Sequence, residues 1–242
     1  MIDLHCHILP GIDDGAAELS DSVGMARQAV ADGIEAICAT PHIRHDHDVR
    51  IEEIDSRVRA LQAELARREV RIELIAGGEV AETALEGLDA EQLRRVTLGE
   101  GTWVLLEPTF GPLSDSLRRR VRHLGERGYR ALIAHPERHL SADLAERLRE
   151  LVEEGALVQV TAEYLLREEV AEGILALAER GLVHVLGSDA HSSRFGRPVQ
   201  IAAAVEALGE AELLRPHLHW IAEEAPAAIV RGDDLEVPFE PL

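Results

Sequence analysis

Seven short apolar stretches alternate with longer segments of helical periodicity along this chain. The stretches cover residues 2–5, 35–40, 72–76, 103–107, 131–135, 157–161 and 182–187. Helical patterns between and after them cover residues 22–31, 51–65, 115–127, 142–153, 168–180, 198–208 and 219–230, the last ending at Gly232. Strands that alternate with helices pair in parallel, and seven such units favour a barrel over an open sheet. We therefore expect an α/β fold, a (β/α)7 TIM-like barrel, in one domain over residues 1–242.

The charge and the cysteine content exclude several classes of protein. The formal net charge is −20, and such a field repels nucleic acid and anionic membranes, so we expect no nucleic-acid partner. Two cysteines are too few for a secreted disulfide scaffold. The N-terminal residues do not resemble a signal peptide, and no apolar run is long enough to span a bilayer. These features predict a cytoplasmic protein without direct membrane insertion.

Side chains that commonly bind metal ions stand at or just after the ends of six of the seven expected strands. The carboxyl ends of parallel barrel strands meet at one mouth, so these separate segments should converge. Strand side chains alternate between two faces, so His5 and His7 should point the same way, as should Asp189 and His191. The candidate ligands at the strand ends are His5, His7, His42, Glu79, Glu107, His135, Asp189 and His191.

The charge of this cluster supports a polynuclear metal site. Asp14, Glu79, Glu107 and Asp189 would repel one another if they were left without cations. Three divalent ions would bring the local charge to about +2, which would attract a phosphate monoester despite the acidic surface. Imidazole and carboxylate ligands together suit Mn, Fe or Zn.

A competing pattern is the Cys-x5-Arg spacing of thiol-dependent tyrosine phosphatases, which Cys38 and Arg44 match. The five residues between them include no glycine that could form an anion-binding loop. Cys38 also falls inside an expected buried strand, where a thiol is usually inert. This pattern is therefore disfavoured. His45 and His47 are expected to be exposed loop residues.

Residues 1–16, Met-Ile-Asp-Leu-His-Cys-His-Ile-Leu-Pro-Gly-Ile-Asp-Asp-Gly-Ala, resemble the N-terminus of the bacterial manganese-dependent tyrosine-protein phosphatases of capsule and exopolysaccharide systems. These enzymes belong to the polymerase-and-histidinol-phosphatase (PHP) superfamily. The resemblance covers essentially the whole chain, through residues 40–42, 78–79, 107, 135–138 and 188–191. It implies a distorted seven-stranded barrel that holds three divalent ions, Mn²⁺ in the first place, with Fe or Zn as alternatives.

The resemblance also assigns roles to individual residues. It implies a first metal at His5, His7, Glu79 and Asp189, a second at Glu79, Glu107 and His135, and a third at Asp14, His42 and His191. Arg138 would contact the phosphate. A second arginine would be Arg197 or Arg194, and Pro198 favours Arg197 because the family has proline there. Ile43 departs from the family, which often has a second histidine at this place, and this puts the substrate contacts of that loop in doubt.

The implied activity is hydrolysis of phosphotyrosine by a metal-bound hydroxide, with the cytoplasmic tail of a bacterial tyrosine kinase as the expected partner. One alternative is another PHP phosphoesterase, such as a histidinol-phosphate phosphatase, which would need the same ligands. The stretch from Ile8 to Gly15 favours the tyrosine phosphatase. A second alternative is a non-catalytic module that binds a kinase tail, which would need neither Glu79 nor Arg138.

Overall fold

The computed structural model describes residues 1–242 and contains two parallel β-sheets. The first has the strand order β1-β2-β4, formed by Ile2–Cys6, Ala36–Ala39 and Glu73–Ala76. The second has the order β3-β5-β6-β7-β8-β9, formed by His42–Ile43, Glu79–Ala81, Trp103–Glu107, Arg130–Ala134, Leu157–Thr161 and Val185–Gly187. Every strand pair is parallel. The expected α/β class is confirmed, whereas one sheet of seven strands is not what the structure shows.

Two of the expected strands, over 35–40 and 72–76, are each followed by a further short strand that belongs to the other sheet. Pro41 separates β2 from β3, and Gly77 and Gly78 separate β4 from β5. Proline has no N–H to donate to a strand ladder, and glycine weakens the interior of a strand, so both mark breaks in pairing. As a result His42 and Glu79 begin new strands instead of ending old ones, and they pair directly with each other in the register of β3 and β5.

A backbone connection also joins β1 to the segment that follows β9. The N–H of Asp189 donates to the carbonyl of His5 at 2.8 Å, and the N–H of His7 donates to the carbonyl of Ala190 at 2.9 Å. Cys6 and Ala190 form an isolated parallel bridge. This connection brings the carboxyl end of β1, with His5 inside it and His7 directly after it, beside the carboxyl end of β9.

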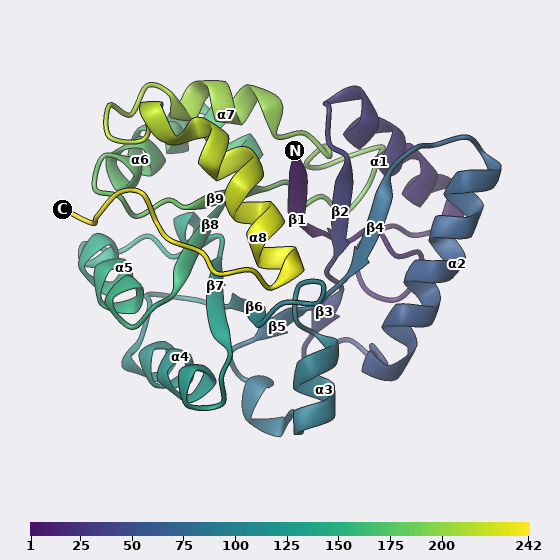
Figure 1. Ribbon diagram of the computed structural model, residues 1–242, viewed down its shortest axis with the longest axis horizontal. Coiled ribbons are helices and arrows are strands. Elements are labelled where there is room, and N and C mark those ends of the chain that lie inside the picture. Colours follow the sequence, from purple (N-terminus) through teal and green to yellow (C-terminus); the bar gives the residue numbers. More distant parts are fainter.

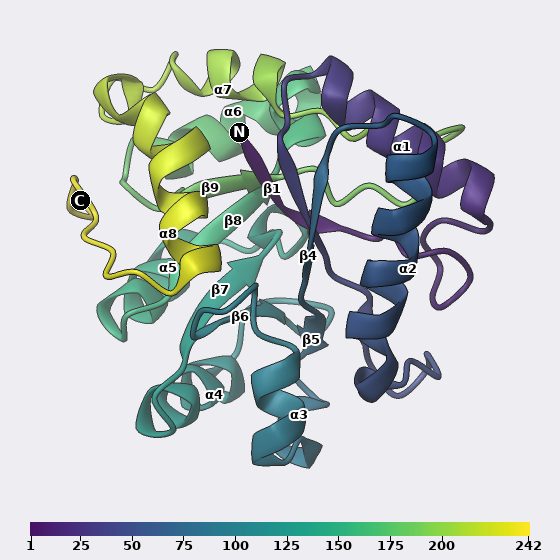
Figure 2. The ribbon, with the colours of Figure 1, turned by 45° about the vertical axis from the view of Figure 1, so that its right-hand side comes forward.

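Helices surround the strands (Figure 1). They are α1 to α8: Leu19–Ala31, Ile54–Arg67, Ala90–Arg95, Asp115–Glu126, Leu144–Glu153, Glu168–Ala178, Ala202–Leu208 and Ala225–Arg231. Figure 2 shows α1 and α2 along the outer side of the β1-β2-β4 sheet. The expected helix over 198–208 begins later, at Ala202, and a turn of π-helix, Trp220–Glu224, precedes α8. Gly232, with φ 71°, ends α8 as expected, because that conformation favours glycine.

The core between sheets and helices is aliphatic, as the low aromatic content predicts. In α4, for example, Leu117, Val121 and Leu124 lie on one face and are buried against the sheet. The buried hydrophobic residues form one continuous cluster. None of the helices is both long and apolar enough to cross a membrane.

Candidate metal centre

The structure brings all nine expected metal ligands together, with His42 and Glu79 at the starts of β3 and β5 and the others at or after the carboxyl ends of strands. They form four overlapping groups, in each of which the ligand atoms lie within 4.8 Å of one another. Six of the nine are buried, whereas Glu107 and His191 are half-buried and Asp14 is exposed. Buried charges are costly unless they are paired or bind cations, so this gathering needs a counter-charge. The groups are His7-Asp14-His42-His191, His5-His135-Asp189, His5-His7-Glu79 and His42-Glu79-Glu107.

Glu79 lies at the middle of the cluster. Its Oε2 atom is 2.9 Å from Nδ1 of His42 and 3.3 Å from Nε2 of both His5 and His7. Its Oε1 atom is 2.8 Å from Nε2 of His135. Burial acts to raise the pKa of the Glu79 carboxyl, but His5, His135 and His42 hold it well below its usual range. The carboxylate is therefore ionised and faces several imidazoles at once.

The Oε2 atom of Glu79 is buried and has no hydrogen bond of good geometry. A buried carboxylate oxygen without such a partner is costly, and a cation among the surrounding imidazole nitrogens would satisfy it. The donor set of five imidazoles and four carboxylates also matches the preferences of Mn, Fe and Zn. The residues present therefore fit divalent metal ions.

Asp14 and two histidines form the outer, more accessible side of the cluster. The Oδ1 atom of Asp14 lies 3.4 Å from Nε2 of His42 and 3.5 Å from Nε2 of His191. The ring of His7 stacks on that of His191 with 4.0 Å between centroids. Burial lowers the pKa of His191 to about 4, so this imidazole is neutral at pH 7 and free to bind a cation.

Two side chains that the sequence analysis missed orient His5, in β1, and His7, directly after it. Nδ1 of His5 lies 3.0 Å from Oε1 of Gln159, and Nδ1 of His7 lies 2.9 Å from Oδ2 of Asp13. In each case the second ring nitrogen, Nε2, is turned toward Glu79. Contacts of this kind fix the orientation of metal-binding histidines. The adjacent pair of aspartates before Gly15 was a signal that could have pointed to Asp13.

Two candidate ligands have left-handed backbone conformations. The φ angle is 34° at His135, directly after β7, and 48° at Asp189, two residues after β9. Such angles are costly for residues other than glycine, and they tend to persist at functional sites. Strand alternation between Asp189 and His191 was therefore the wrong reason to place them together. They do lie close, with Oδ1 of Asp189 3.6 Å from Nδ1 of His191, but this comes from the turn after β9.

Of the candidate phosphate-binding arginines, Arg138 and Arg197 reach the cluster. The guanidinium of Arg138 contacts the Asp189 carboxylate, and Nη2 of Arg197 lies 3.2 Å from Oδ2 of the same carboxylate. Arg197 also donates from Nε to the Asp189 carbonyl at 2.7 Å. Arg194 instead pairs with Glu18 at 2.7 Å on the exposed surface. Arg197, which the sequence analysis preferred, thus lies at the cluster, and Arg194 lies away from it.

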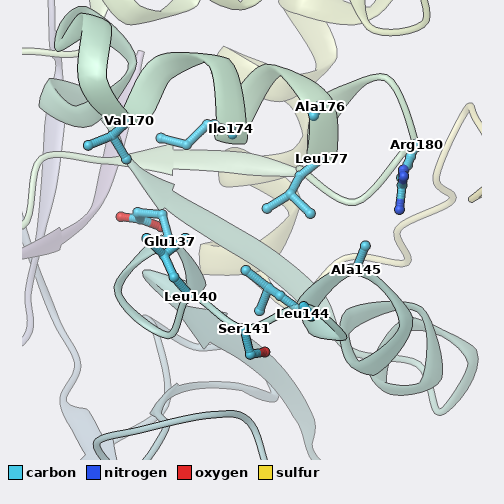
Figure 3. A pocket seen from close by; sticks show the side chains of 12 residues that line it. Glu137, Leu140, Ser141, Leu144, Ala145, Val170, Ile174, Ala176, Leu177 and Arg180 are labelled. Atoms are coloured by element: carbon cyan, nitrogen blue, oxygen red, sulfur yellow. The ribbon is translucent and has the colours of Figure 1, made fainter.

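The turn that carries Arg138 is anchored by its neighbour Glu137. Oε1 of Glu137 accepts a hydrogen bond from the N–H of Thr161 at 2.9 Å. The Glu137 side chain lines an apolar cavity of about 210 Å³ between α5 and α6 (Figure 3). Burial in this surrounding raises the pKa of the Glu137 carboxyl. Glu137 therefore ties this turn to the carboxyl end of β8.

The thiol alternative does not fit the structure. Cys38 lies inside β2 and Cys6 inside β1; both are fully buried, and burial raises the pKa of both thiols. A buried thiol with a raised pKa is a poor nucleophile. Arg44, the partner that the motif requires, instead pairs with Asp46 and with Glu107, at 2.9 and 3.2 Å.

His47 differs from its expected position as an exposed loop residue. It is half-buried, and its ring stacks on that of His42 with 5.0 Å between centroids. The segment after β3 therefore folds back over the cluster, and His47 covers one of the candidate ligands.

The fold and this cluster define a class: α/β proteins with a histidine-carboxylate metal centre at the carboxyl ends of parallel strands. Residues 1–213 match the family model "Capsular polysaccharide synthesis, CpsB/CapC", and the chain belongs to this family. It is 33% identical over 199 residues to the tyrosine-protein phosphatase YwqE of Bacillus subtilis, a match that covers 79% of this chain and 78% of YwqE.

Solved structures agree with this assignment. One, described as YwqE from Bacillus subtilis and CpsB from Streptococcus pneumoniae, unique metal-dependent tyrosine phosphatases, superposes with a TM-score of 0.84 at 29% identity. The match covers 100% of this chain and 99% of that one. The histidinol phosphate phosphatase of Lactococcus lactis has a TM-score of 0.53 at 14% identity, covering 91% of this chain and 94% of that one. This second likeness concerns the fold alone.

Proposed function

We propose that this chain is a metal-dependent protein-tyrosine phosphatase, a phosphoric monoester hydrolase that acts on phosphotyrosine in a capsule or exopolysaccharide system. The observation that carries the proposal is the buried Oε2 atom of Glu79, which faces three imidazole nitrogens without a hydrogen bond of its own. Membership of the CpsB/CapC family and the end-to-end likeness to metal-dependent tyrosine phosphatases support it.

The proposed centre holds three divalent ions, with Mn²⁺ as the preferred metal and Fe or Zn as alternatives. Glu79 can bridge two of them, because its two oxygens face different histidines. The distances support the set Asp14-His42-His191 most directly, because the Asp14 carboxylate lies near both histidines. The proposed sets are His5-His7-Glu79-Asp189, Glu79-Glu107-His135 and Asp14-His42-His191.

Bound divalent ions lower the pKa of water and neutralise the charge that develops on a phosphoryl group. The chain's own contribution is to hold the ligands rigidly and to supply donors to the phosphate oxygens. Arg138 and Arg197, which now share the Asp189 carboxylate, are the donors that stand at the edge of the cluster. A phenolate leaving group, with a pKa of about 10, needs less protonation than an alkoxide, so tyrosine phosphate is a chemically undemanding substrate for this site.

The substrate we propose is the phosphorylated tail of a bacterial tyrosine kinase in the cytoplasm, where ATP-dependent phosphorylation takes place. We further propose that residues 1–242 form a single domain and that the two sheets together make a distorted seven-stranded barrel. The continuous hydrophobic core and the hydrogen bonds between the end of β1 and the segment after β9 support this description.

The test is an assay on a phosphotyrosyl peptide together with metal analysis. Protein treated with chelator should lose activity, and added Mn²⁺ should restore it. Cys38→Ser should retain turnover, because this thiol is buried away from the centre.

Two results would overturn the proposal in different directions. Faster hydrolysis of histidinol phosphate would assign the same site to another PHP phosphoesterase. Protein that contains no metal and stays inactive after metal addition would indicate a non-catalytic module.

A further inference from the structure

A cavity of about 450 Å³ adjoins the metal centre. Glu107, His135 and Arg138 form the side that it shares with the centre. Glu82 and residues 108–110, which follow β6, form part of its other side. A hollow with room for a phenyl ring therefore lies directly beside the side chains that would hold the metal ions and the phosphate.

Phe110 lies at the rim of this cavity and is fully exposed to solvent. The chain has only three phenylalanines, and leaving one in water forgoes a favourable burial of about 2 kcal/mol. A single exposed aromatic residue needs no explanation by itself. Phe110, however, lies on the wall of a cavity that adjoins the metal centre, and this position does need an explanation.

Hydrogen bonds hold the backbone on both sides of Phe110. Oε2 of the buried Glu82 accepts from the N–H and from the hydroxyl of Thr109, both at 3.2 Å. Nδ1 of the buried His139 donates to the carbonyl of Gly111 at 2.7 Å. Gly111 has φ 105°, a conformation that favours glycine. Two buried polar side chains thus fix a short loop whose tip is an exposed aromatic ring.

We propose that Phe110 determines specificity for the leaving group by packing against the aromatic ring of phosphotyrosine in this cavity. The inference rests on the proposed function. A fixed, exposed ring beside the centre gives an aryl phosphate a contact that an alkyl phosphate cannot make, because aromatic pairs attract beyond the area that they bury. Since the loop is already held in place, little ordering cost is incurred when the substrate binds.

The experiment compares Phe110→Ala with the unaltered protein, both loaded with Mn²⁺, on a phosphotyrosyl peptide. The KM should rise about 3- to 10-fold with little change in kcat, because the ring contact exists in the bound substrate and in the transition state alike. Inhibition by a non-hydrolysable phosphonate analogue of the peptide should weaken by the same factor. Inhibition by inorganic phosphate, which has no ring, should stay the same.

Matched variants separate this role from a general disturbance. Phe195→Ala removes another exposed phenylalanine, which does not line the cavity, and should change none of these values. Phe110→Tyr, which keeps an aromatic ring at this position, should have the KM of the unaltered protein. Glu82→Gln, which weakens the hold on Thr109, should raise the KM without changing inhibition by phosphate.

The possible failures are distinct. If the unaltered protein does not hydrolyse the peptide, the proposed function is wrong. If it does, and Phe110→Ala keeps the same KM and the same inhibition by the analogue, the leaving-group role is wrong. An equal loss of affinity for phosphate and for the analogue would also overturn it.

Discussion

The Nδ1 atom of His7 lies 2.9 Å from Oδ2 of Asp13, and that same oxygen accepts a hydrogen bond from the backbone N–H of His42 at 3.0 Å. One carboxylate therefore contacts two proposed metal ligands, His7 directly after β1 and His42 at the start of β3. Asp13 is itself held by the N–H of Gly15, which donates to its Oδ1 at 3.0 Å. A carboxylate behind a metal-binding histidine fixes the ring and makes its other nitrogen a stronger ligand.

Asp13→Asn should weaken metal binding by about 10- to 100-fold, because the amide keeps the shape of the side chain but loses the charge behind His7. Titration of Mn²⁺ into chelator-treated protein measures this, and excess metal should recover most of the activity. Asp48→Asn, at an exposed position in the same part of the chain, is the control and should bind metal normally. An unchanged affinity for Mn²⁺ in Asp13→Asn would show that the contact between Asp13 and His7 does not contribute to metal binding.

Gly15→Ala should cost about 1–3 kcal/mol of stability and most of the activity. A Cβ at this position would collide with the carbonyl oxygen and the Cβ of His7, and neither can move without displacing a ligand. Thermal unfolding and an activity assay measure the two effects. Gly173→Ala is the matched control: it lies within α6, its Cβ would meet nothing within 4 Å, and it should stabilise by about 0.5–1 kcal/mol. Normal activity in Gly15→Ala would contradict the prediction.

The gathering of the candidate ligands could be predicted because it follows from a rule about strands. Glu107 ends β6 and His135 follows β7, so the alternation of strands and helices was enough to place them at one end of the molecule. The division into two sheets was harder to foresee. Pro41 and the pair Gly77-Gly78 are visible in the sequence, but whether such residues end a strand or only bend it depends on what pairs beside them.

Contacts between segments that are far apart in the sequence could not be predicted from sequence patterns. Nothing in the spacing of residues shows that Gln159 accepts from His5 or that His139 holds Gly111. The short helix α3 was missed because six residues carry too little periodicity. Its capping box between Asp89 and Gln92 was a signal that could have revealed it.

Arg197→Ala should lower kcat/KM on a phosphotyrosyl peptide by about 100-fold, the usual cost of removing a donor to developing charge. Arg194→Ala should stay within about twofold of the unaltered protein, because its guanidinium is occupied by Glu18 at the surface. Inhibition by inorganic phosphate gives a second measurement, which should weaken only in Arg197→Ala. A loss of activity in Arg194→Ala but not in Arg197→Ala would instead make Arg194 the phosphate-binding residue.

His184 should make the protein less stable in acid. It is fully buried just before β9, where its Nδ1 accepts from the N–H of Val158 at 3.2 Å, and burial lowers its pKa to about 3 from the ordinary 6.5. Between these values the unfolded chain binds a proton that the folded protein does not. The free energy of unfolding therefore falls as the pH falls from about 6.5 toward 3, by up to about 1.4 kcal/mol per pH unit.

Urea unfolding of chelator-treated protein at pH 7 and pH 5 measures this effect against His184→Asn, whose amide oxygen can still accept from Val158. The unaltered protein should lose about 2 kcal/mol more than this variant between the two pH values, since only the histidine takes up a proton on unfolding. His219→Asn, which changes an exposed histidine, should leave the difference between pH 7 and pH 5 as it is. Equal losses in His184→Asn and the unaltered protein would mean that His184 takes up a proton between pH 7 and pH 5 as readily in the folded protein as in the unfolded chain, and a partner would then have to compensate the buried charge.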